Sequence, residues 1–159
     1  MEKTPELYDR WNEKKKSIEQ KNTRWKRVRR WEIWICNIGV NIGSEISKDD
    51  KFQRPVLILR DHLGGDLVLA IPTSTQWNER YAQYLIPFDD AMSYGMDRST
   101  YFVVNQIRPI STSRLVKVLN NIEVQWVMVP LFPQECIDII LDHYVWLIHK
   151  KKTPIRDHL

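Results

Sequence analysis

Cysteine and histidine, which build most zinc sites and disulfide frameworks, are scarce in this sequence. The chain of 159 residues holds two cysteines and four histidines. Cys36 and Cys136 lie far apart, and the chain has neither a CxxC pair nor a cluster of cysteine and histidine. This argues against a zinc site or a disulfide framework. Both cysteines stand in apolar segments, so we expect reduced core cysteines in a cytoplasmic protein. As a separate expectation, we assign no metal site and no cofactor.

Long apolar runs are also missing. No run approaches the roughly 18 residues of a membrane span, and the N-terminus is charged where a signal peptide is apolar. We therefore expect neither membrane insertion nor export. With 43% hydrophobic residues the chain has enough apolar side chains for one core, and its length suits one domain with an attached segment.

Acidic residues are too few at the N-terminus to balance the basic ones. Residues 1–31 hold eleven Lys and Arg against five Asp and Glu, a net charge of +6. Residues 32–159 hold thirteen against fifteen, a net charge of −2. The basic character therefore belongs to the N-terminal segment, and the rest of the chain needs local positive charge if it is to bind a polyanion.

We interpret residues 1–30 as an extension, residues 31–150 as the main domain and residues 151–159 as a loose tail. A basic run ends the extension, which is expected to form an amphipathic helix with a narrow apolar stripe. Such a segment packs its tryptophans on the domain, binds nucleic acid as a charged arm, or binds a partner protein; the sequence leaves all three open. The stripe consists of Leu7, Trp11, Ile18 and Trp25.

The main domain reads as short strands followed by a helix. Gly64 and Gly65 supply the positive φ angles of a hairpin turn, in which we expect His62 at the surface. A proline, early acids and apolar residues at helical spacing predict a helix from Pro133 through His149. This pattern indicates a mostly β fold, a small antiparallel barrel of the SH3-like type with a C-terminal helix. The expected strands cover residues 31–38, 57–59, 67–71, 84–87 and 101–104, and residues 113–119 lead toward another strand or turn.

Signatures of common enzymes are missing: there is no Walker A loop, GxGxxG, HExxH or GxSxG. The chain is organised instead around residues 31–59, where Arg54 opens an apolar strand and Glu45 lies in the loop before it. A charge held at the mouth of a buried strand is fixed in place, so an anionic partner is expected. Further polar segments stand at strand ends. They are Gly43-Ser44-Glu45, Arg54-Pro55, the run from Ile71 to Gln76, the run from Asn105 to Arg108, and Ser113-Arg114-Leu115.

In this order, these segments resemble the MazF/PemK family of toxin ribonucleases from bacterial toxin–antitoxin pairs. The resemblance covers about residues 31–147, and GSE followed by RPxLxL is its most specific part. It implies an SH3-like barrel that forms a homodimer and cuts single-stranded RNA at a short sequence motif. It also implies cleavage without metal, which leaves a 2′,3′-cyclic phosphate and a 5′-hydroxyl, and inhibition by a cognate antitoxin.

The resemblance implies roles for individual residues. Arg54 matches the arginine of the family's R-P motif, and Ser74, followed by Thr75, matches its catalytic hydroxyl; a one-residue shift would give that role to Thr73. Cleavage by the RNA's own 2′-OH needs the phosphate held in line and its developing charge stabilised, which an arginine and hydroxyls supply. Glu45 is the nearest candidate for the general base. The expected RNA-binding residues are Ser44, Thr73, Gln76, Trp77, Asn105, Gln106, Arg108 and Arg114, with Trp77 stacking on a base.

The sequence departs from the family pattern in three places. The loop of residues 46–53 is longer than is common, the charged arm before Trp31 is unusually long, and Asn105 stands where many members carry an aspartate. Other functions stay open. The same barrel occurs in toxins that bind DNA gyrase and cut nothing, and an inactive paralogue is a third possibility. The motif residues also have structural readings, with Arg54 paired to Glu45 and the other residues in turns or at solvated strand ends.

Overall fold

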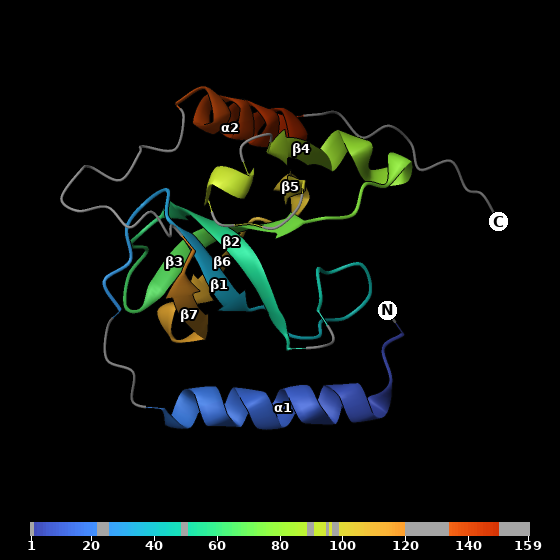
Figure 1. The fold of residues 1–159 in the computed structure, drawn as a ribbon, viewed down its shortest axis with the longest axis vertical. Helices are drawn as coiled ribbons and strands as arrows, with labels where there is room; N and C mark the ends of the chain where they lie inside the picture. The colour runs from blue at the N-terminus through green and yellow to red at the C-terminus, as the bar shows by residue number, and fades with distance from the viewer. Residues whose placement is uncertain are drawn as a thin grey trace.

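The computed structural model describes residues 2–21, 26–48, 51–88, 91–94, 96, 99–119 and 134–149. Figure 1 shows a central sheet with one helix on each side. The helices are α1 (Pro5–Gln20) and α2 (Gln134–His149), and the short 3₁₀ helices are η1 (Glu79–Tyr84), η2 (Ala91–Tyr94), η3 (Val104–Gln106) and η4 (Thr112–Arg114). The strands are β1 (Ile33–Asn37), β2 (Gln53–Arg60), β3 (Leu67–Ser74), β4 (Leu85–Phe88), β5 (Thr100–Val103), β6 (Arg108–Ser111) and β7 (Leu115–Val118).

All seven strands pair antiparallel in one sheet of order β4-β5-β3-β2-β1-β7, with β6 as a further partner of β3. The prediction of a mostly β, antiparallel fold with a terminal helix at each end is confirmed. The predicted barrel differs in one respect: in the described residues the sheet is curled but not closed, because β4 and β7 end its path without pairing with each other. In addition, β6, which contains Pro109, was not predicted as a separate strand.

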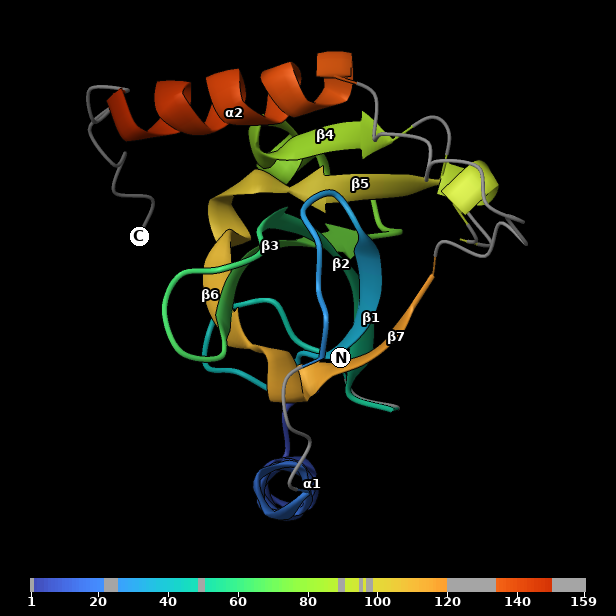
Figure 2. The ribbon, with the colours of Figure 1, turned by 90° about the vertical axis from the view of Figure 1, so that its left-hand side faces the viewer.

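Both faces of the central strands are buried, which explains the unbroken apolar run in β2. Alternate residues of a strand point to opposite faces. Leu57 and Leu59 accordingly join a cluster with Phe102 and Ile140 under α2, whereas Ile58 joins a second cluster inside the curl of the sheet. Ile140 of α2 thus contributes to the first core, and Figure 2 shows α2 lying over β4 and β5.

The N-terminal helix α1 packs on the opposite end of the sheet. Thr4 caps it by accepting the backbone N–H of Leu7, and Pro5 occupies its first turn. Leu7 and Trp11 are buried against Val40 and a neighbouring phenylalanine, and Ile18 lies at the edge of this cluster. The predicted amphipathic helix is confirmed over these residues; Trp25 and the tail at 151–159 lie outside the described residues.

Residues 26–30, which precede β1, cross the curled sheet (Figure 2). We call residues 26–30 the strap. Val28 packs against the inner cluster of the sheet, and the following Trp31 adopts φ +67° as the chain turns into β1. The strap therefore covers a core that the open sheet leaves exposed.

Cys36 is fully buried and free, as predicted for a core cysteine, and burial raises the pKa of its thiol to about 12. The side chain of Cys136 lies outside the described residues. Gly64 and Gly65 adopt φ +108° and +55° in the predicted hairpin turn, and His62 is exposed there.

Among the described helices none is both long and apolar enough to cross a bilayer. No three His, Cys, Asp or Glu side chains in the described part of the chain gather as metal ligands.

Candidate active site

Arg54 is held in one orientation by the backbone of two different segments. Its Nη1 donates to the carbonyl of Thr73 on the neighbouring strand β3 at 2.8 Å, and its Nη2 donates to the carbonyl of Ser47 in the β1–β2 loop at 3.0 Å. The side chain is half-buried. A guanidinium is planar and always charged, so two fixed acceptors orient the whole cation.

The loop that carries Ser47 is itself tied down. Asn41 donates its backbone N–H to Ser47 Oγ at 2.9 Å and its Nδ2 to the carbonyl of Ile46 at 2.7 Å. Lys3, just before α1, and Tyr8, in its first turns, both donate to the carbonyl of Asn41, through Nζ at 2.7 Å and through Oη at 3.2 Å. A path of hydrogen bonds therefore joins the N-terminal helix to the arginine.

Glu45 and Ser44 stand at the outer edge of this loop. Glu45 is 58% exposed, and its Oε2 lies 3.7 Å from Arg108 Nη2. Gln106 accepts the backbone N–H of Ile46 at 3.1 Å and donates to the carbonyl of Ser44 at 3.4 Å. Two residues predicted to bind RNA, Gln106 and Arg108, thus anchor the loop, although they are 60 residues away in sequence.

The three adjacent hydroxyl residues after Pro72 have different environments. Thr73 is 2% exposed and donates its hydroxyl to the carbonyl of Pro55 at 3.0 Å. Ser74 is half-buried, and its Oγ accepts the backbone N–H of Gln76 at 3.2 Å, which leaves the hydroxyl hydrogen to donate elsewhere. Thr75 is exposed. The geometry therefore favours Ser74 over Thr73 as the hydroxyl that meets a substrate.

An aromatic pair lies next to Ser74. Trp77 is 53% exposed, and its ring centre is 5.3 Å from that of Tyr101, with the ring planes tilted by 50°. Tyr101 pairs with Ser74 across the β3–β5 ladder. Tyr101 is predicted from the sequence only as a strand residue; the register between β3 and β5, which the sequence does not show, places it next to Ser74.

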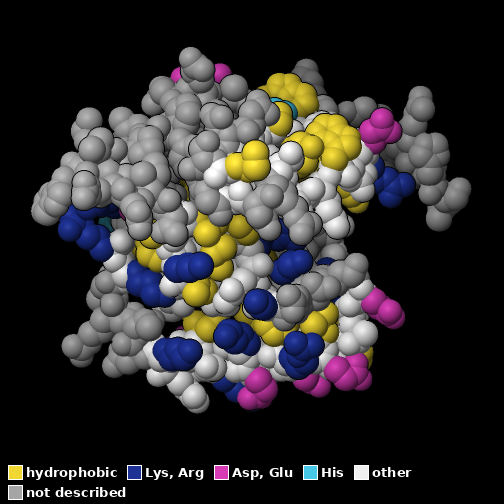
Figure 3. Space-filling model, in the orientation of Figure 1, with side chains coloured by type: hydrophobic (Ala, Val, Ile, Leu, Met, Phe, Trp, Pro, Cys, Tyr) yellow, Lys and Arg dark blue, Asp and Glu magenta, His cyan; other side chains and the backbone are white. Residues whose placement is uncertain are grey.

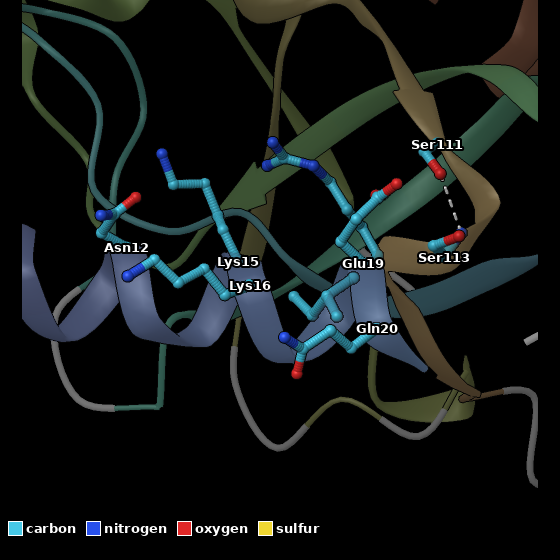
Figure 4. A pocket seen from close by; sticks show the side chains of 9 residues that line it. Asn12, Lys15, Lys16, Glu19, Gln20, Ser111 and Ser113 are labelled. Atoms are coloured by element: carbon cyan, nitrogen blue, oxygen red, sulfur yellow. Dashed lines mark hydrogen bonds between the residues drawn. The ribbon is translucent and has the colours of Figure 1, made fainter. Parts of the chain in front are cut away.

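Arg114 and Asn105 are the predicted residues least integrated into this group. Arg114 directs Nη1 toward the carbonyl of Asn37 at 3.4 Å, and its guanidinium carbon lies 5.5 Å from the Trp11 ring centre under α1. It also lines a groove of about 520 Å³ between α1 and the 111–114 segment (Figure 4). Asn105 is exposed in η3.

The arrangement offers a fixed cation, an accessible hydroxyl, a nearby carboxylate and an exposed aromatic surface. A model of the PemK-like, MazF-like toxins of type II toxin–antitoxin systems matches residues 29–127. The chain belongs to this toxin family. The match includes the strap's last two residues and all strands of the sheet, and the observed antiparallel sheet is the fold of this family.

Two solved structures are similar in fold. One is an endoribonuclease in complex with its cognate antitoxin from a mycobacterial species, with 13% identity, 77% of this chain and 97% of that chain covered, and a TM-score of 0.49. The other is the Mycobacterium tuberculosis toxin MazF-mt6, with 18% identity, 70% and 96% covered, and a TM-score of 0.42. No curated protein sequence matches this toxin.

Proposed function

We propose that this toxin is a metal-independent, sequence-specific endoribonuclease that acts on single-stranded RNA in the cytoplasm. Its membership of the toxin family supports the class of activity. The single observation that carries the chemistry is the anchoring of Arg54 by the carbonyls of Thr73 and Ser47. A cation whose orientation is set before substrate arrives stabilises developing negative charge without reorganising.

In the proposed reaction the RNA's 2′-oxygen attacks the adjacent phosphorus in line. The 2′-O–P bond forms while the P–O5′ bond breaks, which gives a 2′,3′-cyclic phosphate and a 5′-hydroxyl. Arg54 donates to a non-bridging phosphate oxygen, and the Ser74 and Thr75 hydroxyls add further donors. This role needs position and charge rather than a protein nucleophile.

Glu45 is the proposed general base, which accepts the proton of the 2′-OH. The departing 5′-oxygen takes a proton from water. Glu45 suits this role because its carboxylate is exposed and stands in the loop that holds Arg54. Arg108 Nη2, 3.7 Å from Glu45 Oε2, helps to hold the carboxylate in place at the edge of the site.

The same proposal says which residues bind the RNA and which proteins the toxin binds. Trp77 with Tyr101 forms a stacking surface for one base, next to Ser74. Ser44, Gln76, Asn105 and Arg114 are assigned to the surrounding RNA contacts. The toxin acts as a homodimer, and its antitoxin is a short, acidic, partly disordered chain that occupies the RNA site, since such a segment mimics the backbone it displaces.

The test is cleavage of a long single-stranded RNA by the purified protein in excess EDTA, with the ends of the products mapped. Cuts at a recurring short motif with cyclic-phosphate ends are expected. Activity that appears only after a divalent metal is added would contradict the mechanism. Absence of any cleavage, together with relief of toxicity by gyrase mutations, would move the protein to the gyrase-binding class.

A further inference from the structure

The positive charge of the N-terminal extension is not carried by its helix. Within α1, four Lys and Arg are balanced by four Asp and Glu. Residues 21–30 hold six Lys and Arg and no acid. The helix therefore serves packing and loop anchoring, and the charge excess lies in and just before the strap.

The strap presents its arginines outward because its other side chains are used on the sheet. Lys26 Nζ donates to the carbonyl of Leu115, Val28 packs into the inner cluster, and Arg30 Nε donates to the carbonyl of Leu59 at 3.3 Å. Arg27 and Arg29 alternate with these residues and are exposed. In an extended chain, residues two apart lie about 7 Å from each other, which is the order of the spacing between successive phosphates of a single strand.

Counter-charges do not neutralise these two side chains. No ion pair joins the guanidinium groups of Arg27 or Arg29 to a carboxylate in the described part of the chain. The neighbouring acid, Glu32, accepts the backbone N–H of Arg29 at 2.9 Å and the indole N–H of Trp34 at 2.8 Å. Figure 3 shows Lys and Arg side chains across the middle of one face, with the visible Asp and Glu along its margins.

The strap continues from the candidate active site. Arg54 on β2 pairs with Cys36 on β1, which pairs in turn with Leu115 on β7, where Lys26 binds. Adjacent strands lie about 4.8 Å apart, so the Leu115 backbone, which Lys26 Nζ contacts, lies roughly 10 Å from the Arg54 backbone.

The groove between α1 and the 111–114 segment is the less suitable path for a polyanion. Figure 4 shows Lys15 and Lys16 on α1 together with Glu19. Lys16 also pairs with Glu13 at 2.7 Å. This mixed charge makes the two lysines a matched control: two cations of the same extension, equally exposed, away from the strap.

We propose that the strap is a second phosphate-binding site, which holds the backbone of single-stranded RNA beyond the cleaved bond. The proposal rests on the proposed function, since it assigns the strap to the same substrate. An RNA backbone suits this surface better than a protein does, because the strap offers a line of arginines while its apolar Val28 faces inward.

The experiment measures binding of 2′-deoxyuridine 4-mers and 12-mers to the full-length toxin by fluorescence anisotropy across a range of KCl concentrations. Neither probe has the 2′-OH, so neither is cut in the proposed reaction. For the 12-mer, the Arg27→Gln/Arg29→Gln variant is expected to have a slope of log K against log [KCl] that is smaller in magnitude by about 1.4. When KCl falls from 1 M to 0.1 M, the affinity of this variant should therefore rise roughly 25-fold less than that of the wild type. The 4-mer, which fills only the cleavage site, is expected to bind equally to both proteins.

Two further variants make the result specific. Arg27→Lys/Arg29→Lys keeps both charges and is expected to keep the slope, and Lys15→Gln/Lys16→Gln removes the same charge from α1 and is expected to leave it unchanged. The proposal would be overturned if the slope fell equally in Arg27→Gln/Arg29→Gln and Lys15→Gln/Lys16→Gln, or if it stayed unchanged in Arg27→Gln/Arg29→Gln. It would also be overturned if the wild-type protein did not bind the 12-mer. So would loss of binding to polyglutamate without loss of binding to the 12-mer, which would indicate an acidic protein partner.

This test is independent of cleavage. A protein that cuts no RNA but shows the expected slopes would refute the proposed function and leave the strap as a nucleic-acid site. A protein that cuts RNA but shows the same slope in the strap pair would refute the strap alone.

Discussion

Two segments flank Arg54, and they are built in opposite ways. The β1–β2 loop is held from three sides: by Lys3 and Tyr8 at the start of the N-terminal helix and just before it, by its own Asn41, and by Gln106 of η3. The segment after β3, from Ser74 to Trp77, is exposed beyond its first residue, and one side-chain bond, from the Gln76 N–H to Ser74, folds it back on itself.

The difference separates two tasks. The pinned loop fixes a charge, and fixed charge is what stabilises a transition state most. The open segment displays a hydroxyl and an aromatic ring, which the proposed function assigns to the phosphate and to a base of the substrate. Changes in the loop should therefore act on stability and rate, changes at the Ser74 hydroxyl on rate, and changes at the Trp77 ring on binding.

The largest effect is expected for Trp11→Ala. Trp11 is 4% exposed and packs so closely on Gly39 that a Cβ added there would lie 2.0 Å from the ring. Its loss should cost about 3–5 kcal/mol of folding free energy, or roughly 10 °C in thermal melting. Trp77→Ala, the same change at an exposed site, serves as the control; equal melting temperatures of the two variants would contradict the anchoring role of α1.

Arg54→Ala is expected to come next, with loss of about 3–4 kcal/mol of transition-state stabilisation, roughly a thousandfold in cleavage rate. Circular dichroism should show a retained fold. Arg54→Lys keeps the charge but not the planar fork, and should recover only a small part of the rate. Wild-type cleavage by Arg54→Ala would remove this residue from the mechanism.

Ser74 and Thr73 should separate rate from stability. Ser74→Ala is expected to slow cleavage by about 1.5–3 kcal/mol, the value of a hydrogen bond to a charged group, with little change in melting. Thr73→Val, which loses the buried bond to Pro55, should lower folding stability by about 1–3 kcal/mol while the folded protein still cuts. The reverse pattern would shift the motif by one residue.

The smallest effect is expected for Trp77→Ala on the reaction itself. Loss of one stacking surface should weaken RNA binding by about 1–3 kcal/mol, seen as a higher KM with kcat nearly unchanged. Tyr101→Leu should give part of this effect, since it removes the ring against which Trp77 leans. A fall in kcat at constant KM would place Trp77 in the chemical step instead.

The sequence predicted the elements whose patterns are local. The buried run in β2, the Gly64-Gly65 turn and the two helices all appear where propensity and periodicity indicate them. The short strand β6 was missed because Pro109 and polar neighbours mask its pairing with β3. The apolar stripe of the N-terminal helix was predicted correctly at Leu7 and Trp11, which are buried. The pattern within the helix did not show where the helix packs on the domain.

The candidate site was predictable as a set of residues but not as a geometry. The order of the polar segments marked Arg54 and Ser74, yet the burial of Thr73 depends on its bond to a neighbouring strand. Gln106 is predicted to touch RNA, but the sequence did not show that it also holds a loop that lies 60 residues earlier. The role of Ser47, whose carbonyl orients Arg54, could not be predicted from the sequence, because every residue type has a backbone carbonyl.

The docking of the strap on β7 sets the order in which this chain can assemble during synthesis. Lys26 binds the carbonyl of Leu115, and Ile33 of β1 accepts the backbone N–H of Leu119, both across more than 80 residues. A ribosome adding roughly 5–20 residues per second needs several seconds between making the first partner and the last. Throughout that interval β1 lacks β7 to pair with and Val28 lacks the complete inner cluster to pack on, so the toxin acquires its finished surface only after nearly all of its sheet has left the ribosome.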